Sequence, residues 1–150
     1  MKRYLLIAMV ALTCIVSFVF AEGTVSESPQ KLGNPDKLVI TWTSSTNEFV
    51  YDTTGYVRGE IKRVAFIPST TAKPLAAYDI TLKDANDIDI LAGEGANLAS
   101  NVNSTIAVGV TLTDGVNSNA IPFCVNDILK LTVTNCGSLK SGQVVLYYQP

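Results

Sequence analysis

Four side chains that offer oxygen ligands lie close together in one short segment: Asp84, Asn86, Asp87 and Asp89. Calcium prefers carboxylate and amide oxygens, so the segment is a candidate calcium site, although it lacks the glycine and the late glutamate of an EF-hand loop. The same residue types are typical of a tight turn, because Asp and Asn side chains accept hydrogen bonds from nearby backbone N–H groups. Alternation of Ile88 and Ile90 favours a turn between two strands, with both isoleucines pointing inward.

The chain contains no histidine. This removes the usual proton shuttle near neutral pH, and with it serine–histidine and cysteine–histidine catalysis. No nucleophile elbow, phosphate-binding loop or dinucleotide fingerprint is present. A carboxylate pair could still hydrolyse glycosides, and the candidates are Asp84, Asp87, Asp89 and Glu94. A domain this small leaves little room for a deep sugar cleft, so we expect a non-enzymatic protein without a cofactor.

Cys124 and Cys136 lie in the last third of the chain, and Cys14 lies in an apolar N-terminal run. In an oxidising compartment, a disulfide between Cys124 and Cys136 would close a loop of about a dozen residues and stabilise the fold by roughly 2–4 kcal/mol. The alternative is a pair of buried, inert thiols. Two cysteines without histidine do not suggest a zinc site.

Aromatic residues offer a different kind of site, because an exposed ring can stack on a sugar or pack against a partner. Tyr51 and Tyr56 are candidates for such a binding surface. Trp42 is a third candidate, but it lies in an alternating strand pattern that predicts a place in the core.

The N-terminus has the pattern of a secretory signal peptide. Lys2 and Arg3 precede an apolar run over residues 4–20, and small residues at the end of the run predict cleavage after Ala21. The alternative is a retained membrane anchor, of marginal length for a bilayer core of about 30 Å. We therefore expect residues 1–21 to be a signal peptide and the protein to be exported to the periplasm, cell surface or medium.

Cleavage would leave 129 of the 150 residues, which suits one domain. Residues 22–36 are polar, contain two prolines and predict a flexible leader, followed by a single domain over residues 37–150. Since Lys2 and Arg3 belong to the signal, 9 basic residues face 13 acidic ones, for a net charge of −4. Without a basic cluster, we expect neither nucleic-acid binding nor adhesion to anionic membranes.

Apolar and polar residues alternate with the period of a β-strand from Lys37 onward. Strands are predicted at 38–43, 47–51, 55–67, 77–83, 88–91, 106–112, 121–125, 129–133 and 144–148. Turn residues separate the later segments at Asp114-Gly115, Asn126-Asp127 and Asn135-Cys136-Gly137. Gly59, inside one segment, predicts a bulge or a close backbone approach. The pattern predicts an all-β fold, an antiparallel β-sandwich (jelly-roll or immunoglobulin-like) of about eight short strands.

Four stretches carry a family resemblance: ITWTSS (40–45), RVAFIP (63–68), YDITLKDANDIDILAGEGANLAS (78–100) and LTVTNCGSLKSGQVVLYY (131–148). Together they resemble small β-rich proteins encoded among the structural genes of tailed bacteriophages, over about residues 37–148. The resemblance implies a virion accessory or decoration role with no catalytic residues. The export signal and the two cysteines depart from that family, and they bear on the role more than on the fold.

Two functions follow as expectations. The first is a structural subunit of a virion or extracellular assembly, whose partners are other proteins or copies of itself. The alternative is a secreted module that binds a glycan or a cell-surface polymer. A carboxylate-based hydrolase is a third hypothesis, which the small size of the domain disfavours.

Overall fold

The computed structural model describes the backbone of residues 23–33, 35–113 and 118–150, and the side chains of the same residues except 109–122. The predicted signal peptide and the predicted Asp114-Gly115 turn lie outside these residues. The described chain is all-β, with no helix. Its strands are β1 (Thr24–Gln30), β2 (Asp36–Thr43), β3 (Val50–Pro68), β4 (Asp79–Lys83), β5 (Ser104–Ala107), β6 (Gly109–Thr113), β7 (Ser118–Thr134) and β8 (Ser141–Gln149).

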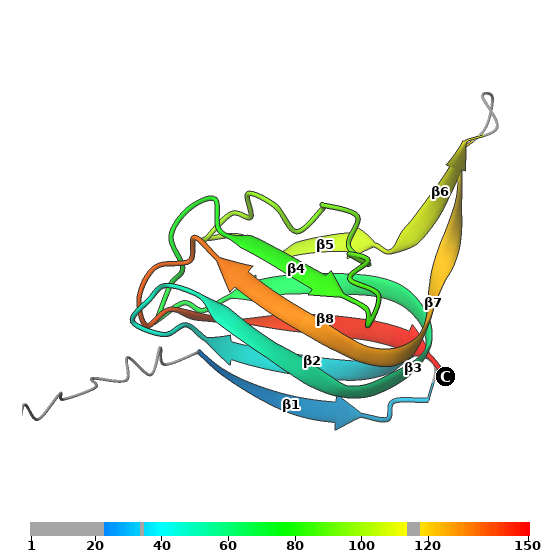
Figure 1. The fold of residues 1–150 in the computed structure, drawn as a ribbon, viewed down its shortest axis with the longest axis horizontal. Helices are drawn as coiled ribbons and strands as arrows, with labels where there is room; N and C mark the ends of the chain where they lie inside the picture. Colours follow the sequence, from blue (N-terminus) through cyan, green and yellow to red (C-terminus); the bar gives the residue numbers. More distant parts are fainter. Residues whose placement is uncertain (1–22, 34, 114–117) are drawn as a thin grey trace, which may run out of the picture.

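All strand pairs are antiparallel. The main sheet has the order β1-β2-β8-β3-β7-β4, with β5 added to β3 and β6 added to β7. Two strands are long, β3 with 19 residues and β7 with 17, and both curve strongly (Figure 1). The first part of β3 pairs only with β7, whereas its last part lies between β8 and β5. The sheet thereby folds over itself into the predicted sandwich, although "short" is wrong for these two strands.

The curvature of β3 is built at two irregularities and one glycine. The pairing register shifts between Thr53 and Tyr56 and again between Ile61 and Arg63. Gly59, between them, has φ of 138°, and a Cβ there would overlap the backbone carbonyl oxygen of Gln149. Bulges bend and twist a strand, and only glycine fits this approach without strain. The predicted close backbone approach at Gly59 is confirmed.

The core lies between the two layers of the sandwich. Alternate residues of β2 point inward, and Trp42 is only 1% exposed. Its ring lies 6.0 Å from that of Tyr78, centroid to centroid, and so joins β2 to the start of β4. Burial raises the pKa of Tyr78 from 10.0 to about 12. The core position predicted for Trp42 is therefore confirmed, and a sugar-binding role for this residue is not supported.

The N-terminal segment differs from its prediction. Residues 24–30, expected within a flexible leader, form β1 and pair with β2 over seven consecutive positions, from Thr24 opposite Thr43 to Gln30 opposite Lys37. Only Val25 packs against the core, and the other side chains of β1 are exposed. An edge strand held by backbone hydrogen bonds needs no apolar alternation, which is why a pattern-based prediction missed it.

Other strand boundaries also differ. Segments 47–51 and 55–67 join into β3, and Asn126 and Asp127 lie inside β7, opposite Arg58 and Val57, so the turn predicted there is wrong. Segment 106–112 divides into β5 and β6 at Val108. Segment 88–91 contributes one isolated pairing, Asp89 with Lys83. The predicted reversal at 135–137 is confirmed, with Asn135 and Gly137 at positive φ.

Strand β7 offers a matched pair of substitutions that tests this description of the core. Leu131 is fully buried, whereas Ile128, three residues earlier, is 45% exposed. Leu131→Ala should lower the free energy of unfolding by about 2–5 kcal/mol, because it leaves a cavity. Ile128→Ala should cost less than about 1 kcal/mol. Urea denaturation measures both, and equal losses would contradict the assigned strand register.

Candidate functional sites

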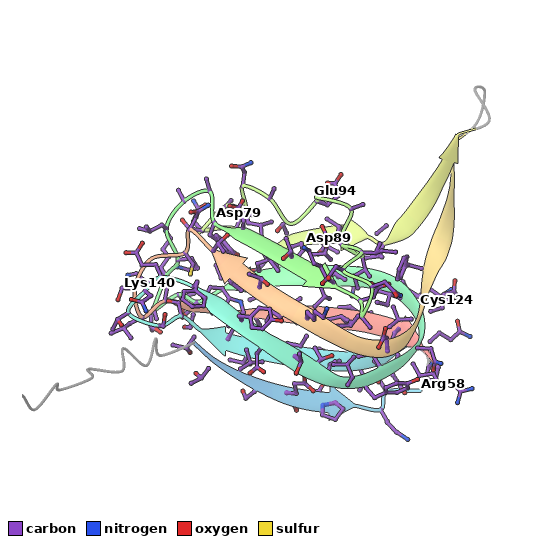
Figure 2. The ribbon with its side chains drawn as sticks, in the orientation of Figure 1. Arg58, Asp79, Asp89, Glu94, Cys124 and Lys140 are labelled. Carbon is purple, nitrogen blue, oxygen red and sulfur yellow. The ribbon has the colours of Figure 1, made fainter. Side chains whose placement is uncertain are left out.

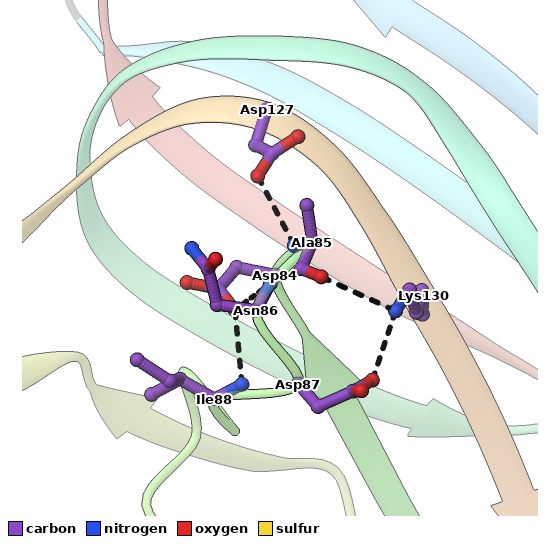
Figure 3. A network of polar contacts seen from close by, with 7 residues as sticks. All are labelled: Asp84, Ala85, Asn86, Asp87, Ile88, Asp127 and Lys130. Atoms are coloured by element: carbon purple, nitrogen blue, oxygen red, sulfur yellow. Dashed lines mark hydrogen bonds and ion pairs between the residues drawn. The ribbon is translucent and has the colours of Figure 1, made fainter.

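The acidic segment is a turn whose carboxylates hold backbone groups (Figure 3). Asp84 accepts hydrogen bonds at Oδ1 from the N–H groups of Asn86 and Ile88, both at 2.9 Å. The backbone N–H of Asp87 donates to the carbonyl of Asp84 at 3.1 Å, and Asp87 has a positive φ of 64°. Asp and Asn are suited to this geometry because their side chains replace missing backbone acceptors and tolerate positive φ. The predicted turn is confirmed.

An ion pair connects this turn to β7. The ammonium of Lys130 lies 2.8 Å from Oδ1 of Asp87, and its hydrogen bond, followed by its charge, lowers the pKa of that carboxyl. Asp127 accepts a hydrogen bond from the N–H of Ala85 at 3.0 Å. Asp87 is well exposed, so the pair positions the turn more than it stabilises the fold.

Asp89 serves the loop that follows the turn. Its Oδ1 accepts from the N–H groups of Leu82 and Leu91 at 3.3 and 3.2 Å, and its Oδ2 accepts from Gly93 at 3.0 Å. The inward position predicted for Ile88 is wrong, since it is 55% exposed, while Ile90 is buried. Asp89 makes only an isolated bridge and the residues on both sides of it lie outside any strand, so alternation does not extend through both isoleucines.

The four calcium candidates therefore do not form a common site. Asp84, Asp87 and Asp89 are each engaged by a different set of backbone or lysine donors, as described above. Among the residues that the structure describes, no group of three His, Cys, Asp or Glu side chains could hold a metal ion. The turn interpretation is the one that the geometry supports.

The loop after Asp89 closes the outer edge of β4. Backbone hydrogen bonds run from Ile90 to Leu82, from Ile80 to Gly95 and from Leu98 to Tyr78, at 2.8–2.9 Å. A Cβ on Gly95 would overlap the carbonyl oxygen of Ile80, so this position requires glycine. Residues 93–97 (GEGAN), which belong to one of the stretches that carry the family resemblance, therefore cover the outer edge of β4.

Among its four candidate residues, the hydrolase hypothesis finds no pair of free carboxylates in the described structure. Glu94 is exposed on the loop (Figure 2). It lines a cavity of about 280 Å³ together with Leu91 and Ile106. It is the only acidic residue in that lining. Glycoside hydrolysis needs two carboxyl groups on either side of the scissile bond, and Asp84 and Asp87 are engaged in the turn while Asp89 is engaged in the loop after it.

The disulfide prediction is wrong. Both cysteines are free, Cys124 exposed and Cys136 buried. Cys124 lies in β7 and Cys136 lies two residues beyond its end, so about 30 Å of extended chain separates them, whereas a disulfide requires Cα atoms within about 7 Å. In Figure 2, Cys124 lies near Arg58 at one end of the sandwich, and Lys140, shortly after Cys136, lies at the other. The alternative of two buried thiols holds for Cys136 only.

The environments of the two thiols differ strongly. Cys136 donates to the carbonyl of Glu48 at 3.2 Å, and burial raises the pKa of its thiol. Cys124 lines an open hollow of about 380 Å³ that is also lined by Arg58, Glu60 and Gln149. The thiolate is the reactive form of cysteine, so the two residues should react at different rates.

The two candidate tyrosines lie at the surface, as a binding role requires. Tyr51 is 46% and Tyr56 is 63% exposed, and both are on the first part of β3. The hydroxyl of Tyr56 donates to the backbone carbonyl of Asn126 at 3.0 Å, which holds its ring across the neighbouring strand β7. Tyr56 pairs with Ile128, itself 45% exposed. Tyr51, Tyr56 and Ile128 are thus three exposed apolar side chains on the neighbouring strands β3 and β7, here called the tyrosine patch.

Comparison with protein-family models, curated proteins and solved structures found no match to this chain. Within residues 23–33, 35–113 and 118–150, no helix is long and apolar enough to cross a membrane.

The thiol assignment can be checked chemically in a Cys14→Ser background, which removes the cysteine of the predicted signal. One thiol equivalent, Cys124, should react rapidly with a disulfide reagent, and a second, Cys136, only when the protein unfolds. Cys124→Ser should abolish the rapid phase and leave the slow one. Absence of any free thiol in the native protein would contradict the assignment, because it would require the bond that the geometry excludes.

Proposed function

We propose that the protein is a non-enzymatic structural subunit, an accessory or decoration-type β-sandwich of a virion or an extracellular assembly. The observation that carries this proposal is a projecting arm. Strand β6 and residues 118–122 of β7 leave the sandwich as a two-stranded hairpin, here called the arm (Figure 1). Within the described chain, the arm strand β6 has pairing contacts with β7 alone.

An extended arm of this kind suits contact with another chain. A two-stranded hairpin is marginally stable in water by itself, and a projecting one adds little to the core of its own domain. Residues 109–122 include a single charged residue, Asp114, out of fourteen. Charged residues are depleted at the centres of protein interfaces, so this composition is compatible with burial against a partner.

Two sequence features agree with this proposal. The N-terminal signal pattern directs the protein to an exported location, where a particle or extracellular assembly would recruit it. The family resemblance points to a role on a virion. Three of the four carboxylates considered for hydrolysis, Asp84, Asp87 and Asp89, are instead engaged within the turn and the loop.

The proposal is tested by locating the protein. Mass spectrometry of secreted material and of purified particles or filaments from the producing cells should find the protein enriched in the particle fraction. The matched control deletes residues 110–121 and joins Gly109 to Pro122 through Gly-Ser, which keeps the sandwich and should leave the protein in the soluble fraction. Recovery of the intact protein only as a soluble monomer would overturn the proposal.

The tyrosine patch favours a second candidate function, binding of a glycan or cell-surface polymer. Exposed aromatic rings can stack on the apolar faces of sugars, and the Tyr56 ring is fixed at the surface by the hydrogen bond from its hydroxyl to the Asn126 carbonyl.

Under this second function, Tyr56→Ala should weaken binding to the polymer at least tenfold in a glycan array or by calorimetry. Tyr56→Phe keeps the ring and should bind within about threefold of the wild type. Tyr147, half-buried under Arg63 elsewhere on the sheet, provides a matched control through Tyr147→Phe. An array without hits for the wild-type protein would remove this candidate.

A further inference from the structure

The open edges of the sheet show which strand can receive another chain. A sheet edge presents unpaired N–H and C=O groups, and proteins that must not aggregate guard such edges with prolines, charges or covering loops. The outer edge of β4 is covered by the loop from Ile90 to Leu98, through the backbone hydrogen bonds described above. That edge is therefore closed to strand addition.

The edges at β1 and at the first part of β3 are guarded in other ways. Pro29 lies within β1 and lacks an N–H, and prolines in sheets occupy edge positions where the missing donor faces solvent. Glu27 places a charge on the same strand. Its two carboxylate oxygens each lie 3.0 Å from the N–H of Gly55, a group on the free edge of β3. Neither edge presents an uninterrupted row of free donors.

Among the described strands, the edges without such a guard include those of β5 and of the two sides of the arm. Strand β5 has four residues, and its end shares a cavity with the loop residues Leu91 and Glu94, which lie beside it. On the β7 side of the arm, Pro122 lies opposite Gly109 and removes a donor. Strand β6, with the sequence GVTLT, contains neither proline nor charge, and among the described strands it pairs only with β7.

We propose that β6 of one copy pairs antiparallel with β6 of a second copy, with Thr111 on the two-fold axis, so that two arms form one four-stranded sheet. This inference rests on the proposed function and names the partner of the arm as a second copy of the chain. A two-fold interface places the same surface of both copies together. The residue on the axis then faces its own counterpart, so a charged residue at that position would oppose a like charge.

The composition of β6 meets this requirement, and that of β1 does not. The five residues from Gly109 to Thr113 carry no charge, so self-pairing creates no repulsion. Self-pairing of β1 about its centre would place Glu27 opposite its own copy, because Glu27 is the middle residue of that strand. A five-residue contact buries little area, so the dimer should form reversibly and depend on concentration, and many such contacts would strengthen one another in an assembly.

The test uses opposite charges at the axis. Sedimentation equilibrium of the purified protein should show a monomer–dimer equilibrium, and Thr111→Lys and Thr111→Glu should each weaken dimerisation at least tenfold. Mixing the two variants should restore dimers with one copy of each, because the lysine and the glutamate then face each other. Ser28→Lys, on the guarded edge strand β1, is the matched control and should dimerise like the wild type.

A second measurement keeps the inference testable if a charged variant is poorly folded. In a Cys14→Ser, Cys124→Ser background, Thr111→Cys should give a disulfide-linked dimer with oxidised glutathione, since directly opposed strand residues place their Cβ atoms about 5 Å apart. Ser28→Cys should cross-link at least tenfold more slowly. Equal cross-linking of the two variants would overturn the pairing.

The outcomes separate this inference from the proposed function. A wild-type monomer at every concentration that is nevertheless enriched on particles would overturn self-pairing and retain the structural role. A dimer that Thr111→Lys leaves intact would also overturn self-pairing through β6. Restoration of dimers only in the mixture of the two charged variants would establish it, whether or not the protein is later found on particles.

Discussion

The fold depends on one strand that belongs to both layers of the sandwich. Strand β3 pairs with β7 along its first part and with β8 and β5 along its last part, so its bend determines how the two layers face each other. The bend is feasible because Gly59 lets the backbone pass directly against Gln149. Burial of Trp42 against Tyr78 follows from this arrangement, since the two rings come from opposite layers.

The acidic segment contains residue types that can bind a metal ion or catalyse hydrolysis, but in this fold they hold a turn and a loop in place. Asp84 and Asp89 accept five backbone hydrogen bonds between them, and Asp87 fastens the turn to Lys130. A carboxylate that accepts several N–H groups is satisfied without a metal ion. Its role is to hold the covering loop against β4, which closes an edge that would otherwise attract another chain.

Because several sheet edges are guarded and the edge of β6 is not, another chain can add to the sheet only at selected places. The sandwich is protected at β4 by the loop, at β1 by Pro29, and at β3 by Glu27, whereas the arm extends away from it with β6 unguarded. A structural subunit needs this asymmetry, because indiscriminate pairing produces aggregates while selective pairing produces an assembly. The tyrosine patch lies on a sheet face and could serve a ligand independently of the arm.

The amino-acid sequence by itself determined the all-β class, most strand positions, the reversal at 135–137, the turn at Asp84 and the core position of Trp42. These depend on period-two alternation and on local turn chemistry, which act over a few residues. Tertiary structure alone decided three features: β1 as an edge strand with exposed side chains, the continuity of β7 through Asn126 and Asp127, and the separation of Cys124 from Cys136. In each case, the outcome depends on which backbone lies alongside, because pairing with a distant strand can order a polar segment and override a local turn signal.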